Sequence, residues 1–201
     1  METVVINASP RTDTGKVASN RYRREGVVPC VLYSKEGNLQ FNAQPSELKA
    51  LLYTPKFKVA EINFNGQTHR CILKEVQTHP VTDQITHLDF LKLIKGTPVK
   101  VEVPVTLKGA AVGVKSGGKL VQRIRTVHIK ASSENIVPEV YLDVTKLDLG
   151  QTMRVRDIIP VSGVEIVNPA STPVVGVEIP RALKGAAAEE TKAAAGAPAK
   201  K

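Results

Sequence analysis

Aromatic residues are few in this sequence, which has no tryptophan, four phenylalanines and four tyrosines among 201 residues. A hydrophobic core must therefore be built mainly from Val, Ile and Leu, and the hydrophobic fraction of 42% favours folded structure over most of the chain. No apolar run approaches the roughly 18 residues that cross a bilayer, which argues against a transmembrane protein. The chain does not open with a basic segment followed by a long apolar one, so no signal peptide is expected.

Cysteine is also scarce. Cys30 and Cys71 each lie in an apolar, strand-like run. Disulfide-rich scaffolds use more cysteines than this, and cysteine-based zinc sites use them at close spacing. We therefore expect two reduced thiols in the core of a cytoplasmic protein, and neither a metal ion nor another cofactor.

The charge is strongly positive, with 28 Lys and Arg against 19 Asp and Glu and a formal net charge of +9. Such an excess favours a polyanionic partner or an anionic surface. The densest basic cluster runs from Arg11 to Arg24 and contains a single acid, Asp13. This segment is therefore the first candidate for contact with an anion.

A Gly/Pro break and a change in composition along the chain indicate two domains and a tail. Lys95-Gly96-Thr97-Pro98 separates two blocks of strand-like sequence, because Gly and Pro both interrupt regular structure. The segment from Arg181 is rich in Ala, Lys and Gly and lacks branched apolar residues after Leu183. We expect domains at 1–95 and 96–180 and a disordered basic tail at 181–201.

The first block has the pattern of an α+β domain. Asn65-Gly66 between two apolar runs predicts a β-hairpin. Gly26 is a natural end for a basic helix, and Ser46 is a candidate helix cap. The expected strands are Thr3–Ala8, Val27–Tyr33, Val59–Phe64, Thr68–Val76 and Ile85–Leu93, and the expected helices are Lys16–Glu25 and Ser46–Tyr53.

The second block has the pattern of an all-β domain, either a sandwich or a barrel-like module. Apolar and polar residues alternate from Val99 to Lys108, and Pro104 favours an edge position for this strand. No helix is clearly required in this block. The further expected strands are Leu120–Ala131, Glu139–Val144, Thr152–Arg156, Val164–Val167 and Pro173–Ile179.

The basic helix would present cations on one face. Lys16, Asn20 and Arg24 follow each other at a spacing of four, and Ser19 and Arg23 form an adjacent row. Cations and short hydrogen-bond donors suit phosphates and ribose hydroxyls. A solvated basic face is the alternative.

A second set of polar residues falls on strands. Gln77 and His79 are two residues apart, as are His87 and Asp89, so each pair points to one side of an extended chain. If the strands pair through a turn at 80–84, the four side chains gather on one sheet face. They could then bind base edges and 2′-hydroxyls in a shallow RNA groove, or they could be ordinary solvent-facing residues.

Two patterns suggest catalysis but have weak support. His87, Asp89 and His128 imitate the ligand set of non-haem iron enzymes, yet His128 lies beyond the expected domain boundary. The segment Gly113–Lys119 fits the start of a phosphate-binding loop, but Leu120 replaces the required Ser or Thr. A glycine-rich β-turn explains it better, and no catalytic residue is assigned.

The segment Gly15–Tyr33 resembles the opening of the bacterial large-subunit ribosomal protein twenty-five family. It has Gly-Lys, a serine, spaced arginines, a glycine, and a proline before an aliphatic strand that ends in tyrosine. Val76–Pro80 and Ile85–Phe90 resemble later signatures of that family. Residues 96–180 resemble the added domain of its long form, general stress protein Ctc, through Val103-Pro104-Val105, Gly113–Leu120 and Leu142 to Gly150.

The resemblance implies a mainly β, non-enzymatic, ribosome-associated protein of the bacterial cytoplasm. Its first domain would be six-stranded and barrel-like and would bind the loop E region of 5S rRNA, with neighbouring ribosomal proteins as further partners and no membrane or small-molecule substrate. A stress-induced protein-interaction module acting away from the ribosome stays open as an alternative. The candidate contacts carried over by position are Lys16, Ser19, Arg21, Arg23, Tyr33, Gln77, His79, His87 and Asp89, to which the helix rows add Asn20 and Arg24.

Overall fold

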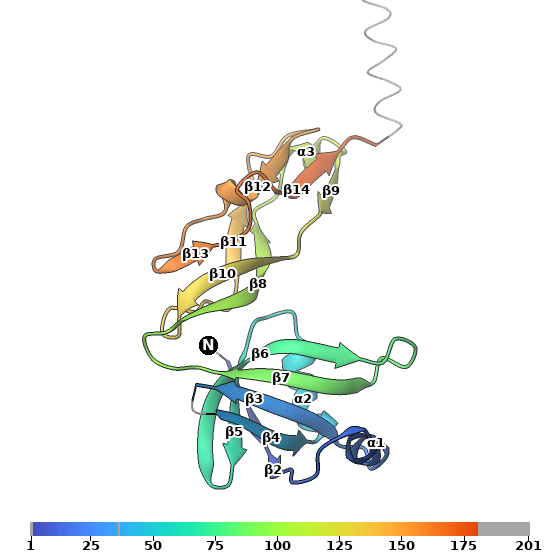
Figure 1. Ribbon diagram of the computed structural model, residues 1–201. Helices are drawn as coiled ribbons and strands as arrows, with labels where there is room; N and C mark the ends of the chain where they lie inside the picture. The colour runs from blue at the N-terminus through green and yellow to red at the C-terminus, as the bar shows by residue number, and fades with distance from the viewer. Residues whose placement is uncertain (1, 36, 181–201) are drawn as a thin grey trace, which may run out of the picture. The chain divides into compact units, whose positions relative to one another are not determined.

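The computed structural model describes residues 2–35 and 37–180 of the chain (Figure 1), so the disorder expected for 181–201 concerns residues outside the described part. The chain divides into two compact units. The first comprises Met1–Pro104, His128–Glu139 and Ser162–Glu165, and the second comprises Val105–Val127, Val140–Val161 and the residues from Ile166. The domain boundary expected at 95–98 stays a prediction.

A curled seven-stranded sheet and two helices make up the amino-terminal part of the first unit. The strand order is β1-β5-β6-β7-β3-β4-β2, and β1–β5 and β3–β7 are parallel pairs. The elements are β1 Thr3–Asn7, β2 Ser9–Pro10, α1 Lys16–Arg24, β3 Val28–Ser34, β4 Gly37–Ala43, α2 Pro45–Leu52, β5 Val59–Phe64, β6 Gln67–Thr78 and β7 Ile85–Lys92.

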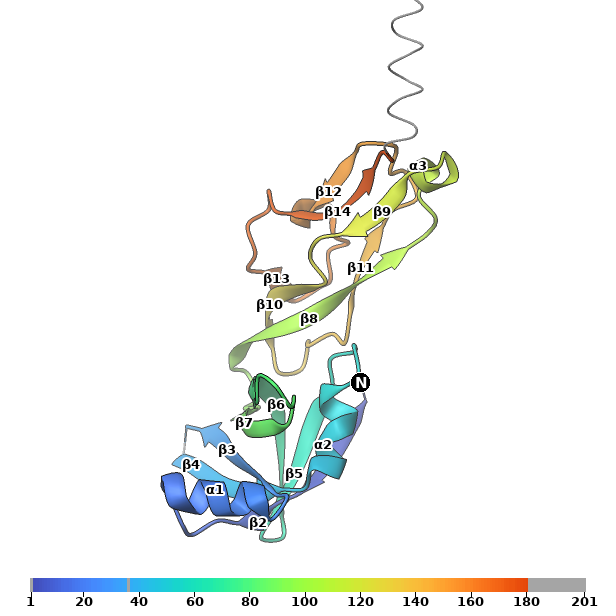
Figure 2. The ribbon, with the colours of Figure 1, turned by 90° about the vertical axis from the view of Figure 1, so that its right-hand side faces the viewer.

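The core of this sheet lies on its inner, concave face and is mostly aliphatic, as the composition predicts. Leu32, Phe41 and Phe90 are almost fully buried there, and the rings of Phe41 and Phe90 lie 5.9 Å apart between centroids. Helix α2 contributes Leu48 and Leu51 to the same cluster. Figure 2 shows α2 beside β1 and β5, and α1 at a separate position beside β3 and β4.

Helix α1 ends where the sequence predicts. Gly26 has a φ of +79°, a left-handed conformation that glycine adopts without steric cost. The Gly26 N–H donates to the Arg23 carbonyl at 3.2 Å, and the Val27 N–H donates to the Tyr22 carbonyl at 3.0 Å. These two bonds satisfy carbonyls of the last turn and direct the chain into β3.

The start of α2 differs from the expected cap at Ser46. The helix begins at Pro45, whose fixed φ suits the first helical position, and Gln44 precedes it. Glu47 in the first turn accepts hydrogen bonds from the backbone N–H of Asn7 at 2.8 Å and from its side-chain amide at 3.0 Å. This carboxylate therefore fastens α2 to β1.

The hairpin expected at Asn65-Gly66 is confirmed, with φ values of +49° and +80° and with Phe64 opposite Gln67. Strand β4 was not expected from the sequence. Its core residues, Leu39 and Phe41, alternate with amide side chains, and the resulting period of two indicates a strand. Strands β4 and β2 bring the total to seven rather than the expected six.

Both cysteines are free and buried, as their apolar surroundings in the sequence predict. Burial raises the pKa of Cys30 to about 12 and also raises the pKa of Cys71. We expect both thiols to resist Ellman's reagent at pH 8 in the native protein and to react once it is unfolded, because the thiolate is the reactive form. The free energy of unfolding should fall as the pH rises from about 9 towards 12, because the cysteine thiols lose their protons in the unfolded chain before they do so in the folded protein. Rapid labelling of the native protein by Ellman's reagent at pH 8 would contradict the expected protection of the thiols.

The sequence after residue 96 forms two further sheets, with strand orders β11-β8-β10-β13 and β12-β14-β9. The expected mainly β fold is thereby confirmed. The elements are β8 Pro98–Lys108, α3 Val112–Lys115, β9 Lys119–Gln122, β10 Thr126–Ser132, β11 Val140–Asp143, β12 Thr152–Arg154, the 3-10 helix Val155–Asp157, β13 Val164–Ile166 and β14 Pro173–Glu178.

Three details of this part differ from the expectation. Strand β8 is an inner strand rather than an edge strand, and it accommodates Pro104 because the ladder with β11 begins only at Val105. The long strand expected from Leu120 is divided into β9 and β10. The strand at 152 is cut short by the 3-10 helix, where the Asp157 carboxylate accepts a bond from the Arg154 N–H at 2.8 Å.

The glycine-rich segment at 113–118 is short helix α3 and a turn, followed by strand β9 rather than the helix of a phosphate-binding loop. Its glycines permit close packing. A Cβ atom at Gly113 would lie 2.7 Å from the backbone of Asp148 and Leu149. A Cβ atom at Gly118 would lie 2.4 Å from a Val177 methyl group. Packing therefore accounts for both residues.

None of the helices in the described residues has the length and apolar character that a membrane-crossing segment requires.

Candidate nucleic-acid interface

Strands β6 and β7 pair through the turn at 80–84, as the sequence predicts. Gln77 lies opposite His87, and Glu75 lies opposite Asp89. Opposite residues of an antiparallel pair share a face of the sheet. Leu88 and Phe90 alternate with His87 and Asp89 and are buried in the core, so these polar residues lie on the outer face.

The same outer face continues onto β3, which runs parallel to β7. Val31 pairs with Asp89, and Tyr33 pairs with Leu91. Tyr33 is 38% exposed, whereas Leu32 beside it is fully buried on the inner face. The outer surface formed by Tyr33, Gln77, His87 and Asp89 is called the polar strand face below.

A half-buried pair occupies the centre of the polar strand face. His87 Nδ1 lies 3.0 Å from Asp89 Oδ1, and the two side chains are 21% and 17% exposed. This distance permits an ion pair when His87 is protonated, but no well-aligned hydrogen bond reaches the buried Oδ1 atom. Within the described part of the chain, Asp89 Oδ1 therefore has His87 at contact distance but no aligned hydrogen bond.

His79, in contrast, belongs to the turn rather than to the polar strand face. It follows the last residue of β6, and its Nδ1 accepts weak bonds at 3.3 Å from the backbone N–H groups of Val81 and Thr82. Its own backbone bonds to Gln84 and Asp83. These contacts indicate that His79 stabilises the turn through its backbone and Nδ1. None of them uses Nε2.

Helix α1 covers one end of the outer face. Pro29 and Asn42 pair with each other across β3 and β4 and are buried, although Val28 and Cys30 beside Pro29 point into the core. Helix α1 packs against β3, which explains how the outer face is covered there.

A direct hydrogen bond joins α1 to the polar strand face. The Arg23 Nε–H donates to the backbone carbonyl of Thr86 at 3.0 Å, next to His87 in the chain. The Thr86 hydroxyl in turn donates to the carbonyl of Gln77 at 2.9 Å. The helix, β7 and β6 are thereby linked through Thr86, between the predicted candidates Arg23 and Gln77.

The rest of α1 is open to solvent, and none of its residues is fully buried. Lys16 and Arg24 are exposed, and neither has an ion-pair partner within residues 2–35 and 37–180. The Asn20 side-chain oxygen accepts a long bond of 3.4 Å from Arg23. The helix therefore presents unpaired positive charge.

Ser19 and Arg21 are less available than the sequence suggests. The Ser19 hydroxyl donates to the Gly15 carbonyl at 2.9 Å and accepts a bond from Arg11 at 2.9 Å. Arg21 forms an ion pair with Asp13 at 2.8 Å. Both residues are thus engaged within the chain.

Comparison with known proteins matches the amino-terminal residues 6–90 to the model of the ribosomal L25p family, and residues 98–181 to the model described as ribosomal protein TL5, C-terminal domain. The large ribosomal subunit protein bL25 of Phocaeicola vulgatus is 40% identical over 200 residues, which cover 96% of this chain and all of that protein. The protein of the same name from Cytophaga hutchinsonii is 35% identical over 92% of this chain and 95% of its own length. The chain belongs to the ribosomal L25p family.

Membership of the L25p family identifies a ribosomal protein rather than an enzyme. In the described residues, no group of three or more His, Cys, Asp and Glu side chains is placed to hold a metal ion.

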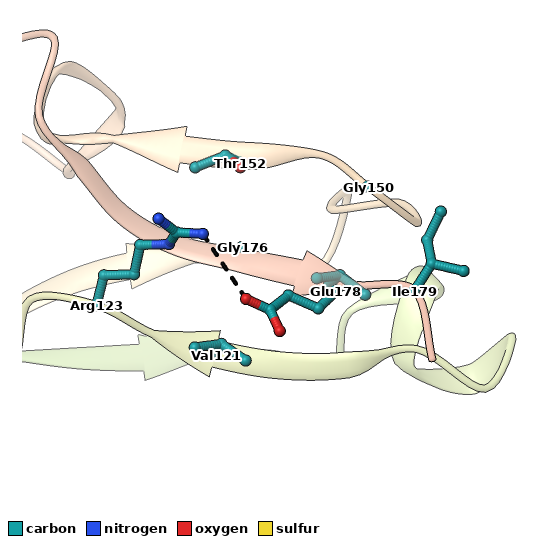
Figure 3. A pocket seen from close by; sticks show the side chains of 8 residues that line it. Val121, Arg123, Gly150, Thr152, Gly176, Glu178 and Ile179 are labelled. Atoms are coloured by element: carbon teal, nitrogen blue, oxygen red, sulfur yellow. Dashed lines mark ion pairs between the residues drawn. The ribbon is translucent and has the colours of Figure 1, made fainter. Parts of the chain in front are cut away.

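A hollow on the three-stranded sheet has a structural explanation in this L25p-family chain (Figure 3). Gly176 lies at its centre, and a Cβ atom there would lie 3.1 Å from the Thr152 hydroxyl. Arg123 and Glu178 form an exposed ion pair at 3.7 Å beside it. The hollow thus reflects a missing side chain in β14, and its lining shows no nucleophile paired with a base.

Two contributors to the geometry of the candidate interface were not identified from the sequence. Arg11 stacks on Tyr22 and bonds to Ser19, so it orders the segment before α1. Thr86 connects α1 to β6. The signal for Arg11 was its place in the basic cluster, but the contact of Thr86 uses a backbone carbonyl, which no side-chain pattern reveals.

Proposed function

We propose that this chain is a structural component of the large ribosomal subunit in the bacterial cytoplasm and that it binds the loop E region of 5S rRNA through α1 and the polar strand face. The names of the L25p-family relatives support the ribosomal assignment. The observation that carries the RNA site is the Arg23–Thr86 hydrogen bond, since it makes one continuous surface of a cationic helix and a polar sheet.

The phosphate contacts come from α1. Lys16 and Arg24 lie at the two ends of the helix and are free to neutralise phosphates. Arg23 uses its Nε–H on Thr86, and its remaining guanidinium donors can contact a second site. Contacts of this kind orient RNA on the protein but do not read its sequence.

The base contacts come from the polar strand face. Gln77 offers a donor and an acceptor, and Asp89 offers an acceptor. The wide minor groove of A-form RNA displays base edges and 2′-hydroxyls at a depth that sheet side chains can reach. The Asp89 carboxylate, whose side chain is 17% exposed on this face, accepts a hydrogen bond from an exocyclic amine of a base.

The distribution of charge sets the orientation of the RNA. Glu75 and Asp89 face outward on neighbouring strands, whereas the cations are concentrated on α1. Two carboxylates repel phosphate oxygens, so the sugar-phosphate backbone favours the helix and the base edges face the strands. A uniformly basic surface would not impose this orientation.

The salt dependence of binding tests this assignment. The double substitution Lys16→Gln and Arg24→Gln should weaken binding to 5S rRNA and reduce the slope of log K against log salt by about 1.4 to 1.8, since each lost phosphate contact contributes about 0.7 to 0.9. Filter binding of the full chain at several KCl concentrations measures this slope.

Lys49→Gln with Lys56→Gln is the matched control, because it removes the same charge from exposed lysines in and just after α2. We expect this control to leave the slope near the wild-type value. An equal change in the two double variants would show that net charge, rather than α1, determines binding.

A further inference from the structure

The segment before α1 contains an acid at the centre of the basic cluster. Asp13 Oδ2 lies 2.8 Å from the terminal nitrogen of Arg21, in the middle of the helix. A carboxylate presents to a guanidinium the same arrangement of acceptor oxygens that a phosphate presents. In the free protein, Asp13 therefore occupies the terminal nitrogen of Arg21, while Glu25 lies farther away, at 3.8 Å from Nε.

Aromatic stacking fixes the geometry of this contact. The guanidinium groups of Arg11 and Arg21 lie 5.5 Å and 5.3 Å from the centre of the Tyr22 ring. Cation–π contacts of this kind restrict each guanidinium to the ring face. Arg21 is thus held in a defined position before RNA arrives.

Arg11 fixes the position of Asp13 itself. The Arg11 Nε–H donates to the backbone carbonyl of Asp13 at 2.7 Å, and its terminal nitrogen donates to Ser19 at 2.9 Å. The first bond lies within the segment before α1, and the second fastens that segment to the helix. Asp13 is presented to Arg21 by this frame and does not depend on a chance side-chain conformation.

We propose that Asp13 is an internal competitor for RNA phosphate, which holds Arg21 in the free protein and releases it when RNA binds. The inference rests on the proposed function of α1. Asp13 is a positioning residue here, since it acts through Arg21 and does not touch RNA.

The exchange is energetically accessible because the ion pair is exposed. The Arg21 and Asp13 side chains are 57% and 51% exposed, and exposed ion pairs contribute little to stability. A phosphate can therefore displace the carboxylate at small cost. That cost still opposes each binding event, so Asp13 lowers the affinity for RNA.

The substitution Asp13→Asn tests the competition. Asparagine keeps the size of the side chain and removes its charge. We expect the full chain to bind loop E RNA about two- to five-fold more tightly at low salt, which corresponds to an exposed ion pair. The slope of log K against log salt should stay near the wild-type value, since Arg21 contacts the same phosphate in the complex of either protein.

Two controls separate competition from a general charge effect. In an Arg21→Gln background, Asp13→Asn should change the affinity by much less, because the group that it releases is absent. Asp83→Asn removes the same charge from the β6–β7 turn and should leave the affinity near the wild-type value. An equal gain in affinity with and without Arg21 would overturn the proposal.

The outcome also separates this inference from the proposed function. Wild-type protein that fails to prefer 5S rRNA over an unrelated duplex contradicts the proposed function itself. Wild-type protein that shows the preference, with Asp13→Asn binding equally or more weakly, contradicts the competition alone. Asp13→Ser removes the carboxylate with a different side chain, and thermal unfolding of both variants should match that of the wild type.

Discussion

Asp89→Ala should weaken binding to loop E RNA by about five- to 150-fold, which corresponds to the 1–3 kcal/mol of a specific base contact. The reason is that the Asp89 carboxylate, which is 17% exposed, offers the base edge an acceptor in a half-buried setting, where a lost hydrogen bond is costly. His87 Nδ1 lies 3.0 Å from Asp89 Oδ1 and holds the carboxylate in position for the base. The stability of the protein should change little, because the substitution removes no aligned hydrogen bond to Oδ1.

The measurement is a comparison of dissociation constants for loop E RNA and for a regular RNA duplex of equal length. Glu75→Ala is the matched control, since Glu75 lies opposite Asp89 on the same face and is exposed. We expect this control to bind loop E RNA as well as the wild type or more tightly, because a repulsive charge is removed. Equal losses of Asp89→Ala on both RNAs would rule out specific readout by Asp89.

Gly118→Ala should lower the free energy of unfolding by about 1–3 kcal/mol, the usual cost of overpacking a close-packed site. The added Cβ atom would lie 2.4 Å from a Val177 methyl group and 2.6 Å from both the Gly113 carbonyl oxygen and a Leu149 methyl group. One of these neighbours is backbone, so a side-chain rotation cannot relieve all three contacts. Urea unfolding of the full chain, followed by circular dichroism, measures the loss.

Gly150→Ala is the control for this effect. Gly150 has a φ of +74°, and a Cβ atom there would meet only Ile179, at an ordinary distance of 3.6 Å. Its substitution should cost about 1–2 kcal/mol through backbone strain alone. Gly118 has no such φ, so a neutral Gly118→Ala variant would show that its neighbours can move apart.

Local patterns predicted the elements that depend on neighbours in the chain. Gly26 ended α1 and Asn65-Gly66 formed a hairpin, because each position needs a left-handed backbone conformation that these residues tolerate. Strand β4 was missed, although Leu39 and Phe41 alternate with amides. Pro104 was misleading because the requirement for an edge depends on where the partner strand begins.

The residues of the candidate site were likewise predicted only in part from local patterns. The alternation of His87 and Asp89 with core residues determined that both point outward, and the turn at 80–84 brought Gln77 opposite His87. His79 had the same spacing but falls past the end of β6, where the turn uses its ring nitrogen. Spacing predicts a shared face only while the strand continues.

The amino-acid sequence alone determined the charge of α1, the aliphatic core and the identity of the polar residues, since these follow from composition and short-range periodicity. Only the tertiary structure decided which groups are free to act. Arg21 and Arg24 both lie in the basic cluster, yet Asp13 and Glu25 pair with Arg21 while Arg24 is unpaired in the described part of the chain. The contact between Asp13 and Arg21 depends on how the chain before α1 folds back on the helix, which residue spacing does not predict.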